Sequence, residues 1–195
     1  MTMSMRDRMK RETNLALTRA AQDLVHERGS AHVTVDDIAA AAGVSVRTFF
    51  NYFTCKEAAI VGIPPEVLEA LAADLRARPS GESPVQALRA VVLSQALVND
   101  IQHRWLLRAE LVQREPNLLP HYLAALTDLE AALVPPLAER MSSDPATDPA
   151  PSMLIAAILG ALRAAAAFWE QSDRSMPLLV VLERAFEWPS TSHAH

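Results

Sequence analysis

The sequence predicts an all-α protein of about nine helices, with a small N-terminal domain followed by a larger C-terminal one. Half of the 195 residues are hydrophobic, alanine and leucine dominate, and only five residues are glycine. This composition favours helices, because strands prefer β-branched and aromatic residues. Apolar residues also recur at helical spacing along most of the chain. The single cysteine, Cys55, excludes a fold that is held together by internal disulfides.

The first helix is expected over residues 12–28. Leu17 and Leu24 lie on its apolar face, and Gly29 occupies the position that commonly ends a helix. Residues 6–11 hold four Lys or Arg and one Asp. We therefore expect a basic N-terminal arm before this helix.

A helix-turn-helix is expected next. Thr34 can cap a helix that is barely two turns long, because its hydroxyl can accept from free backbone N–H groups. Gly43 supplies the positive φ that a tight turn needs, and Ser45 caps a third helix over residues 46–53. Two short helices joined by such a turn form a helix-turn-helix.

The third helix has two distinct faces. Phe49 and Phe53 are four residues apart and are expected in the core. Four polar residues are then expected to point outward: Arg47, Thr48, Asn51 and Tyr52.

Helical periodicity continues to the C-terminus. The expected helices cover residues 56–78, 84–102, 104–114, 117–141, 152–171 and 177–188. Pro64-Pro65 should break the first of these, and Pro135-Pro136 should disturb the helix over 117–141. Residues 142–151 form a Pro/Asp/Ser linker, and residues 190–195 should fray.

Charge is distributed unevenly along the chain. The net charge is −5, yet residues 1–60 carry eight Lys or Arg and seven Asp or Glu. A near-neutral head with a basic arm, joined to an acidic body, indicates two different roles.

No membrane span is expected. The longest apolar run, residues 153–169, is seventeen residues long and contains Arg163, so it is short for a bilayer and carries a charge near its middle. Residues 1–13 are polar and basic, with no apolar signal segment behind them. We expect a soluble, cytoplasmic protein with no membrane partner.

The segment from Thr34 to Glu57, TVDDIAAAAGVSVRTFFNYFTCKE, resembles the DNA-binding segment of TetR-type transcriptional regulators. The likeness rests on the Gly-Val-Ser turn, the aromatic-rich second helix and the Lys-Glu start of the next helix. It covers about 45 residues, ending at Ile60. It implies an obligate homodimer on a near-palindromic double-stranded DNA operator. It also implies a C-terminal domain that binds a small-molecule effector and then releases the DNA, as a repressor does.

The resemblance assigns DNA-binding roles by motif position. Contacts to phosphate are implied for Thr34, Tyr52 and Lys56, while the start of the recognition helix carries Ser45, Val46, Arg47 and Thr48. Two positions depart from the pattern of the family. Phe50 replaces a common tyrosine, and Cys55 replaces the usual Ser or Asp helix cap.

The chemistry of these side chains supports the same roles. Arg47 can form two hydrogen bonds to guanine O6 and N7, or it can contact a phosphate. Thr48 can touch a thymine methyl or a phosphate, and Asn51 can read adenine or face solvent. Lys56 lies at a helix N-terminus, where backbone N–H groups favour an anion. Phe50 is expected in the core, or against the sugar-phosphate edge of DNA.

The last two helices are expected to form the dimer interface. Small residues let helices approach closely, and the resemblance implies a four-helix bundle with the second copy. The interface is assigned to Ala157, Gly160, Ala161, Ala164, Leu178, Leu182 and Phe186. The alternative is that both helices are buried within one subunit.

An effector pocket is expected among the C-terminal helices. It should be largely apolar with a few polar groups, and it is assigned to Gln95, Asn99, Gln102, Trp105, Arg108, Tyr122, Phe168 and Trp169. These residues would equally suit a filled core. In that case the protein would be a constitutive, redox-controlled or protein-controlled regulator.

The run over residues 115–140 is similar to the C-terminal domain of mycofactocin-type regulators within the same family. The expected division is therefore a DNA-binding domain over 1–55, an effector and dimerisation domain over 56–189 and a tail over 190–195.

No enzyme motif is present, so neither catalysis nor a cofactor is expected. The six histidines are dispersed, which makes a metal site unexpected as well. Cys55 beside Lys56 could act as a redox sensor, or it could be an ordinary loop cysteine.

Overall fold

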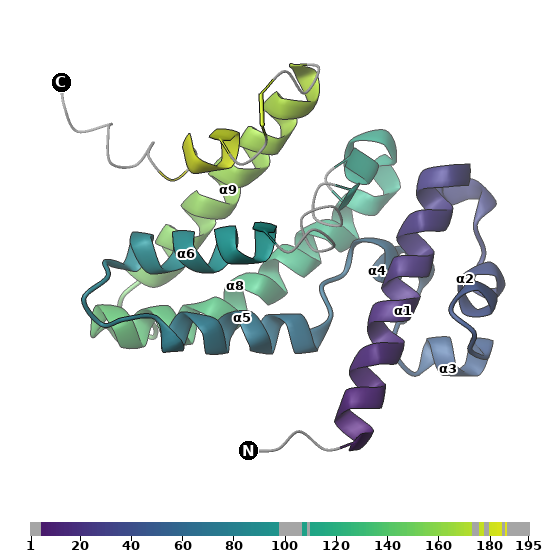
Figure 1. Ribbon diagram of the computed structural model, residues 1–195, viewed down its shortest axis with the longest axis horizontal. Coiled ribbons are helices and arrows are strands. Elements are labelled where there is room, and N and C mark those ends of the chain that lie inside the picture. The colour runs from purple at the N-terminus through teal and green to yellow at the C-terminus, as the bar shows by residue number, and fades with distance from the viewer. Residues whose placement is uncertain are drawn as a thin grey trace. The chain divides into compact units, whose positions relative to one another are not determined.

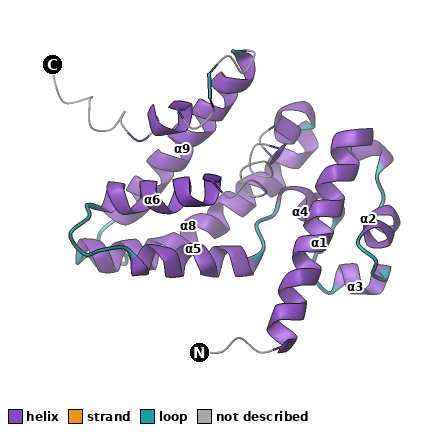
Figure 2. Ribbon diagram, in the orientation of Figure 1, coloured by secondary structure: helices purple, strands orange, loops and turns teal. Residues whose placement is uncertain are grey.

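Helices account for all the regular secondary structure of the residues that the computed structural model describes: 5–97, 107–108, 110–172, 176–177, 180–184 and 186 (Figure 2). This confirms the all-α prediction. The contacts divide the chain into two compact units. The first comprises Met1–Val67 and Glu110–Ala125, and the second comprises Leu68–Ala109 and Leu126–His195.

The first unit is built on a long helix, α1 (Met5–Arg28), which packs against α2 (Val35–Ala41) and α4 (Lys56–Val61) (Figure 1). The short helix α3 (Val46–Phe50) packs against α2. The core of this helical part of the first unit combines apolar residues from all four helices with Val33 from the segment before α2: Leu17, Ala21, Val25, Val33, Ile38, Ala39, Phe49, Ala59, Ile60 and Val61.

Helix α1 begins seven residues earlier than expected, so part of the basic arm is helical. Lysine, arginine and glutamate form helices readily without an apolar face. Arg8 also lies 3.8 Å from the carboxylate of Glu12 one turn later, a pair that supports this turn.

Two glycines end their segments as predicted. Gly29 has φ of 77° and Gly43 has φ of 69°, a conformation that L side chains adopt only with strain. Gly29 separates α1 from a 3-10 turn, η1 (Ser30–His32), and Gly43 lies in the turn between α2 and α3.

Helix α3 ends three residues earlier than predicted. The N–H groups of Asn51 and Tyr52 donate to the carbonyls of Thr48 and Phe49 at 3.1 and 2.9 Å, respectively, which tightens the chain into a turn. The rings of Phe49 and Phe53 still meet at 5.7 Å, although only Phe49 is fully buried.

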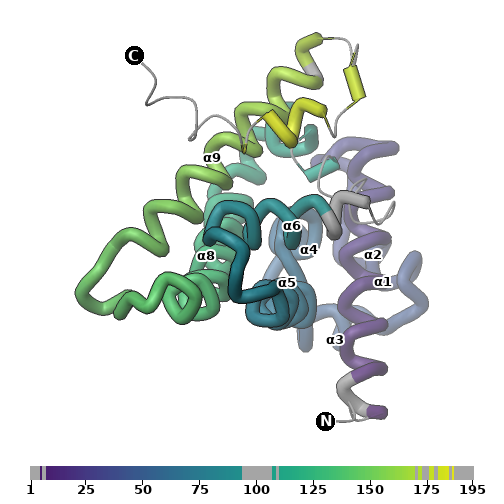
Figure 3. The backbone as a smooth tube through the Cα atoms, turned by 60° about the vertical axis from the view of Figure 1, so that its left-hand side comes forward, coloured from purple at the N-terminus to yellow at the C-terminus, as the bar shows by residue number. Residues whose placement is uncertain are grey.

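The second unit contains most of α5 (Pro65–Ala77), together with α6 (Pro84–Leu97), the C-terminal part of α8 (Leu119–Met141) and α9 (Ala150–Gln171) (Figure 3). Helix α4 ends at Val61 and α5 begins at Pro65, so the helix expected over residues 56–78 is interrupted beside Pro64-Pro65, as predicted. One apolar core joins these four helices and the residues near 182–186: Leu75, Ala87, Leu88, Val91, Leu133, Leu137, Ile155, Ile158, Leu162, Leu182 and Phe186.

The expectation that Pro135-Pro136 disturbs its helix is wrong, because α8 continues through both prolines. Each proline removes one backbone hydrogen bond. The neighbouring Leu133 and Leu137 are buried in the core, and this packing stabilises the helical conformation on both sides of the prolines.

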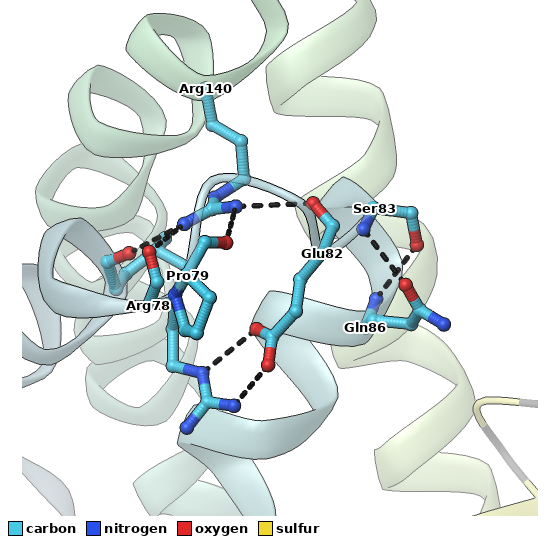
Figure 4. A network of polar contacts seen from close by, with 7 residues as sticks. Arg78, Pro79, Glu82, Ser83, Gln86 and Arg140 are labelled. Atoms are coloured by element: carbon cyan, nitrogen blue, oxygen red, sulfur yellow. Dashed lines mark hydrogen bonds and ion pairs between the residues drawn. The ribbon is translucent and has the colours of Figure 1, made fainter.

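Arg140 ties the end of α8 to the loop between α5 and α6 (Figure 4). Its guanidinium donates to the carbonyls of Arg78, Pro79 and Glu82 at 2.7, 2.8 and 3.1 Å. Arg78 and Glu82 form an ion pair beside it. Because a helix leaves its last carbonyls without partners, Arg140 supplies donors where α5 ends, to the carbonyl of Arg78 just after the helix and to two carbonyls of the following loop.

Candidate nucleic-acid interface

Complete caps fix the two helices of the helix-turn-helix. The Thr34 hydroxyl accepts from Asp37 N at 3.2 Å, while the Asp37 carboxylate accepts from Thr34 N at 2.9 Å. Ser45 Oγ accepts from Thr48 N at 3.0 Å. Both residues therefore cap as the sequence predicts, and a capping box of this kind fixes the start of a helix.

The N-cap of α2 has an anionic partner. The Thr34 hydroxyl also donates to Asp37 Oδ2 at 2.6 Å. This hydrogen bond is the main reason that the pKa of Asp37 lies below its ordinary value. Both Thr34 donors therefore point to a carboxylate, so a phosphate contact at Thr34 requires that its hydroxyl turn away from Asp37.

Helix α3 and its C-cap present three exposed side chains with chemistry suited to DNA. Arg47 and Asn51 are exposed and make no side-chain hydrogen bond or ion pair with any described residue. Phe50 is 55% exposed, so the expectation that it lies in the core is wrong. Its ring meets Phe49 edge-on at 5.4 Å. Ser45 is exposed as well, while Val46, Thr48 and Tyr52 are half-buried.

The Lys56 side chain has hydrogen-bond partners within the protein. Its ammonium donates to the carbonyl of Ser30 at 2.6 Å and to that of Val33 at 2.9 Å. Two of its three donors thus hold the loop between α1 and α2. The sequence showed only that Lys56 begins a helix, because these carbonyls lie 26 and 23 residues away.

The same loop is held from a distant part of the chain. Glu115 accepts from Ser30 N at 3.0 Å and from Ser30 Oγ at 2.7 Å. The hydroxyl and then the backbone N–H of Ser30 hold the pKa of Glu115 below its ordinary value. Residues 110–125 therefore belong to the same compact unit as the helix-turn-helix, whereas the division expected from sequence places them in the effector and dimerisation domain.

The described residues include only part of the predicted effector set. Asn99, Gln102 and Trp105 lie outside the described residues, as does the Gln95 side chain. Arg108 is half-buried, and Tyr122 is buried but belongs to the first unit.

Two further residues of that set lie at the end of α9. Phe168 is 54% exposed. The indole of Trp169 donates to the Met176 carbonyl at 2.7 Å.

A cavity of about 290 Å³ lies between α5 and α6. Its lining residues are Asp74, Ala77, Arg78, Ala90 and Val91. None of the predicted effector residues is among them. Its volume is near the lower limit of ordinary ligand pockets, roughly 300 Å³.

One side of α9 is exposed in the described part of the chain, and it consists mostly of small and apolar residues together with Arg163. Met153 is 66% exposed, and Ala156, Ala157 and Ala164 are exposed. A Cβ placed on Gly160 meets nothing within 4 Å. The stretch Ala150–Trp169 is only 22% buried, and by length and composition it is the one described helix that could cross a membrane.

The predicted interface residues divide between this face and the core. Ala157 and Ala164 lie on the open face, and Gly160 and Ala161 are half-buried. Leu182 and Phe186 are buried within the chain, so for these two residues the alternative of burial within one subunit describes the structure. Leu178 lies outside the described residues.

Comparison with known proteins identifies the family. The model of the bacterial regulatory proteins of the TetR family matches residues 17–60, and that of the MftR C-terminal domain matches residues 82–190. The chain belongs to the TetR family. It is a transcriptional regulator with an N-terminal helix-turn-helix, and the expected likeness to mycofactocin-type regulators is confirmed.

Relatives of this TetR-family chain match over nearly its whole length. The transcriptional regulator TcmR of Streptomyces glaucescens is 32% identical, over 94% of this chain and 83% of its own. FadR of Thermus thermophilus, a TetR-family repressor solved with lauroyl-CoA, is 28% identical, with a TM-score of 0.54 over 89% of this chain and 91% of its own. The fatty acid degradation regulator FadR of Bacillus halodurans shares the fold, with a TM-score of 0.60 at 18% identity over 94% and 97% of the two chains.

Sequence reasoning missed one cluster in the first unit. Cys55, Glu57 and His121 bring three potential ligand atoms within 4.8 Å of one another. No signal in the sequence could have found it, because His121 is 66 positions from Cys55.

Proposed function

We propose that this protein is a homodimeric repressor that binds a near-palindromic operator and leaves it when a small-molecule effector binds. The observation that carries the DNA-binding part is the set of free, exposed side chains on α3. A recognition helix reads base edges with its N-terminal and outward residues, and Arg47 and Asn51 are exposed there with no side-chain partner among the described residues.

Arg47 is the residue proposed to read bases. Its guanidinium can form two parallel hydrogen bonds to guanine, which discriminate against other bases by about 1–3 kcal/mol. Thr48 and Asn51 are the neighbours that could add contacts in the major groove. The exposed ring of Phe50 is suited to packing against the sugar-phosphate edge.

Phosphate binding is proposed for Tyr52 and for the basic residues of α1. Tyr52 is half-buried, and Arg8 and Lys10 are exposed. Attraction of such cations to phosphate is independent of sequence and weakens with salt. Thr34 and Lys56 are proposed to act mainly by stabilising the fold of the helix-turn-helix. The Thr34 hydroxyl already donates to Asp37, and the Lys56 ammonium already donates to two carbonyls.

The open face of α9 is the proposed centre of the dimer. Small residues allow the same helix of a second copy to approach closely, and an isologous interface needs one self-complementary patch. Phe168, expected in the effector pocket, extends the same exposed side of α9. Contact with a second copy would bury the exposed side of α9, which explains why an apolar helix is only 22% buried within a single chain.

A small-molecule effector is proposed on the basis of the similar regulator that was solved with lauroyl-CoA. Such a ligand must bind the DNA-incompetent state more tightly, and the difference in affinity limits the switch. We place its site in the C-terminal helices and its action in the cytoplasm.

The test is selection of duplexes from a random DNA library with the purified protein. We expect an enriched inverted repeat whose half-sites are separated by about one or more helical turns. Enrichment of a single, non-repeated site would contradict dimeric recognition. An enriched set no different from the starting library would contradict specific DNA binding.

A further inference from the structure

Three side chains that favour transition metals converge in the first unit. Cys55 immediately precedes α4, Glu57 lies in its first turn, and His121 lies near the start of α8. Their ligand atoms, a sulfur, a carboxylate oxygen and an imidazole nitrogen, lie within 4.8 Å of one another. Thiolate, imidazole and carboxylate are the ligands that Zn²⁺ takes in proteins.

The distance between the Cys55 sulfur and the His121 nitrogen is close to that of a tetrahedral site. With a Zn–S bond of about 2.3 Å and a Zn–N bond of about 2.0–2.1 Å, a tetrahedral ion places S and N about 3.5–3.6 Å apart. Cys55 Sγ and His121 Nδ1 lie 3.9 Å apart. A movement of a few tenths of an ångström is enough for both atoms to bind one ion.

The three groups are also available to bind. Cys55 occupies the N-cap position of α4 but makes no capping hydrogen bond, and its sulfur accepts a long hydrogen bond from the Thr54 hydroxyl at 4.0 Å. All three residues are half-buried, which shields the site while leaving access for an ion. The ammonium of Lys56 is held by the carbonyls of Ser30 and Val33.

We propose that Cys55, Glu57 and His121 bind one divalent transition-metal ion of the Zn²⁺ class, with water as a fourth ligand. On binding, the Cys55 thiol gives up its proton to solvent and the thiolate ligates the ion. The ion would tie residues 55–57, just after the recognition helix, to residue 121 within the same compact unit. This inference does not depend on operator binding, so its test uses no DNA.

The experiment is titration of the reduced, tag-free protein with Co²⁺, a spectroscopic probe for zinc sites, followed by displacement with Zn²⁺. We expect one ion per chain and a thiolate-to-cobalt charge-transfer absorption that Zn²⁺ abolishes. Cys55→Ser should remove the absorption. Glu57→Gln and His121→Gln should each weaken Co²⁺ binding at least about tenfold, the scale on which metal-site residues act.

Two controls separate this site from other histidines. His32→Gln replaces an exposed histidine of the same unit, and a double His193→Gln, His195→Gln variant removes the tail pair. Both should bind Co²⁺ as the wild type does, and circular dichroism should show that every variant keeps its helicity. Absence of the charge-transfer band would overturn the proposal. Wild-type Co²⁺ affinity in both Glu57→Gln and His121→Gln would overturn it as well.

Discussion

The Glu115 carboxylate accepts two hydrogen bonds from Ser30, one from its backbone N–H at 3.0 Å and one from its hydroxyl at 2.7 Å. Ser30 also gives its carbonyl to Lys56 at 2.6 Å. One residue between α1 and α2 thus joins the helix-turn-helix to α4 and to a segment 85 residues further along the chain.

This relationship predicts a pH-dependent contribution to stability. Because the folded pKa of Glu115 lies below its ordinary value, its contribution is present above the ordinary pKa, about 4.5, and is lost as pH falls through the folded pKa. Glu115→Gln should lower the free energy of unfolding by about 1–2 kcal/mol at neutral pH. Urea unfolding of both proteins between pH 3 and 7 should show the difference shrinking in acid; a constant difference would contradict the carboxylate's role.

Lys56→Met should destabilise the head and change the salt dependence of DNA binding little. The change leaves the carbonyls of Ser30 and Val33 without their charged donor, at a cost of about 1–3 kcal/mol. Urea unfolding measures that cost. If Lys56 instead serves mainly as a phosphate contact, stability would be unchanged and the slope of log K against log salt would fall by about 1.

Arg47→Ala should weaken operator binding by about 1–3 kcal/mol and relax the preference at one base pair in each half-site. Stability should not change, because Arg47 is exposed and has no described partner in the protein. Fluorescence anisotropy against operator variants measures both effects. Arg184→Ala, at an exposed arginine of the second unit, is the control and should bind as the wild type does. Unchanged base preference in Arg47→Ala would refute its reading role.

Ala157→Glu should dissociate the dimer and leave the subunit folded. The residue is exposed within one chain, so a carboxylate there is hydrated in a monomer and buried without a partner in the proposed interface. Sedimentation velocity should show a monomer for this variant. Ala73→Glu, at an exposed position of α5, should leave the dimer intact, and a dimeric Ala157→Glu protein would place the interface elsewhere.

Arg140→Met should lower the free energy of unfolding by about 2–4 kcal/mol, because three carbonyls between α5 and α6 lose a charged donor. The matched control is Arg76→Met. Arg76 pairs with Glu139 at 3.2 Å, but both side chains are about half exposed or more, so its loss should cost under about 1 kcal/mol. Thermal and urea unfolding compare the two; equal effects would show that the contacts in Figure 4 contribute no more than a surface pair.

Local signals predicted the head well. Thr34 and Ser45 cap their helices, and Gly29 and Gly43 adopt positive φ, because each of these choices depends on neighbours within a few residues. The early end of α3 was missed, since helical spacing of its aromatic residues continues into the turn. The exposure of Phe50 was missed for a similar reason, as apolar character alone does not say which side of a short helix packs.

The long-range contacts could not be predicted from the sequence. The partners of Lys56, the bond between Glu115 and Ser30, and the approach of His121 to Cys55 join residues 23 to 85 positions apart. None of them leaves a periodic pattern. The continuous course of α8 through Pro135-Pro136 likewise depends on core packing that a single sequence does not display.

The most direct test of the central claim is an equilibrium titration of the protein with its selected duplex and with a scrambled duplex, repeated over a range of salt concentrations. The account predicts tight binding of one dimer to the selected duplex, a steep loss of affinity with salt, and a preference of at least about 10³ over the scrambled sequence. Equal affinity for the two duplexes, or no binding to either at low salt, would contradict sequence-specific DNA recognition by α3.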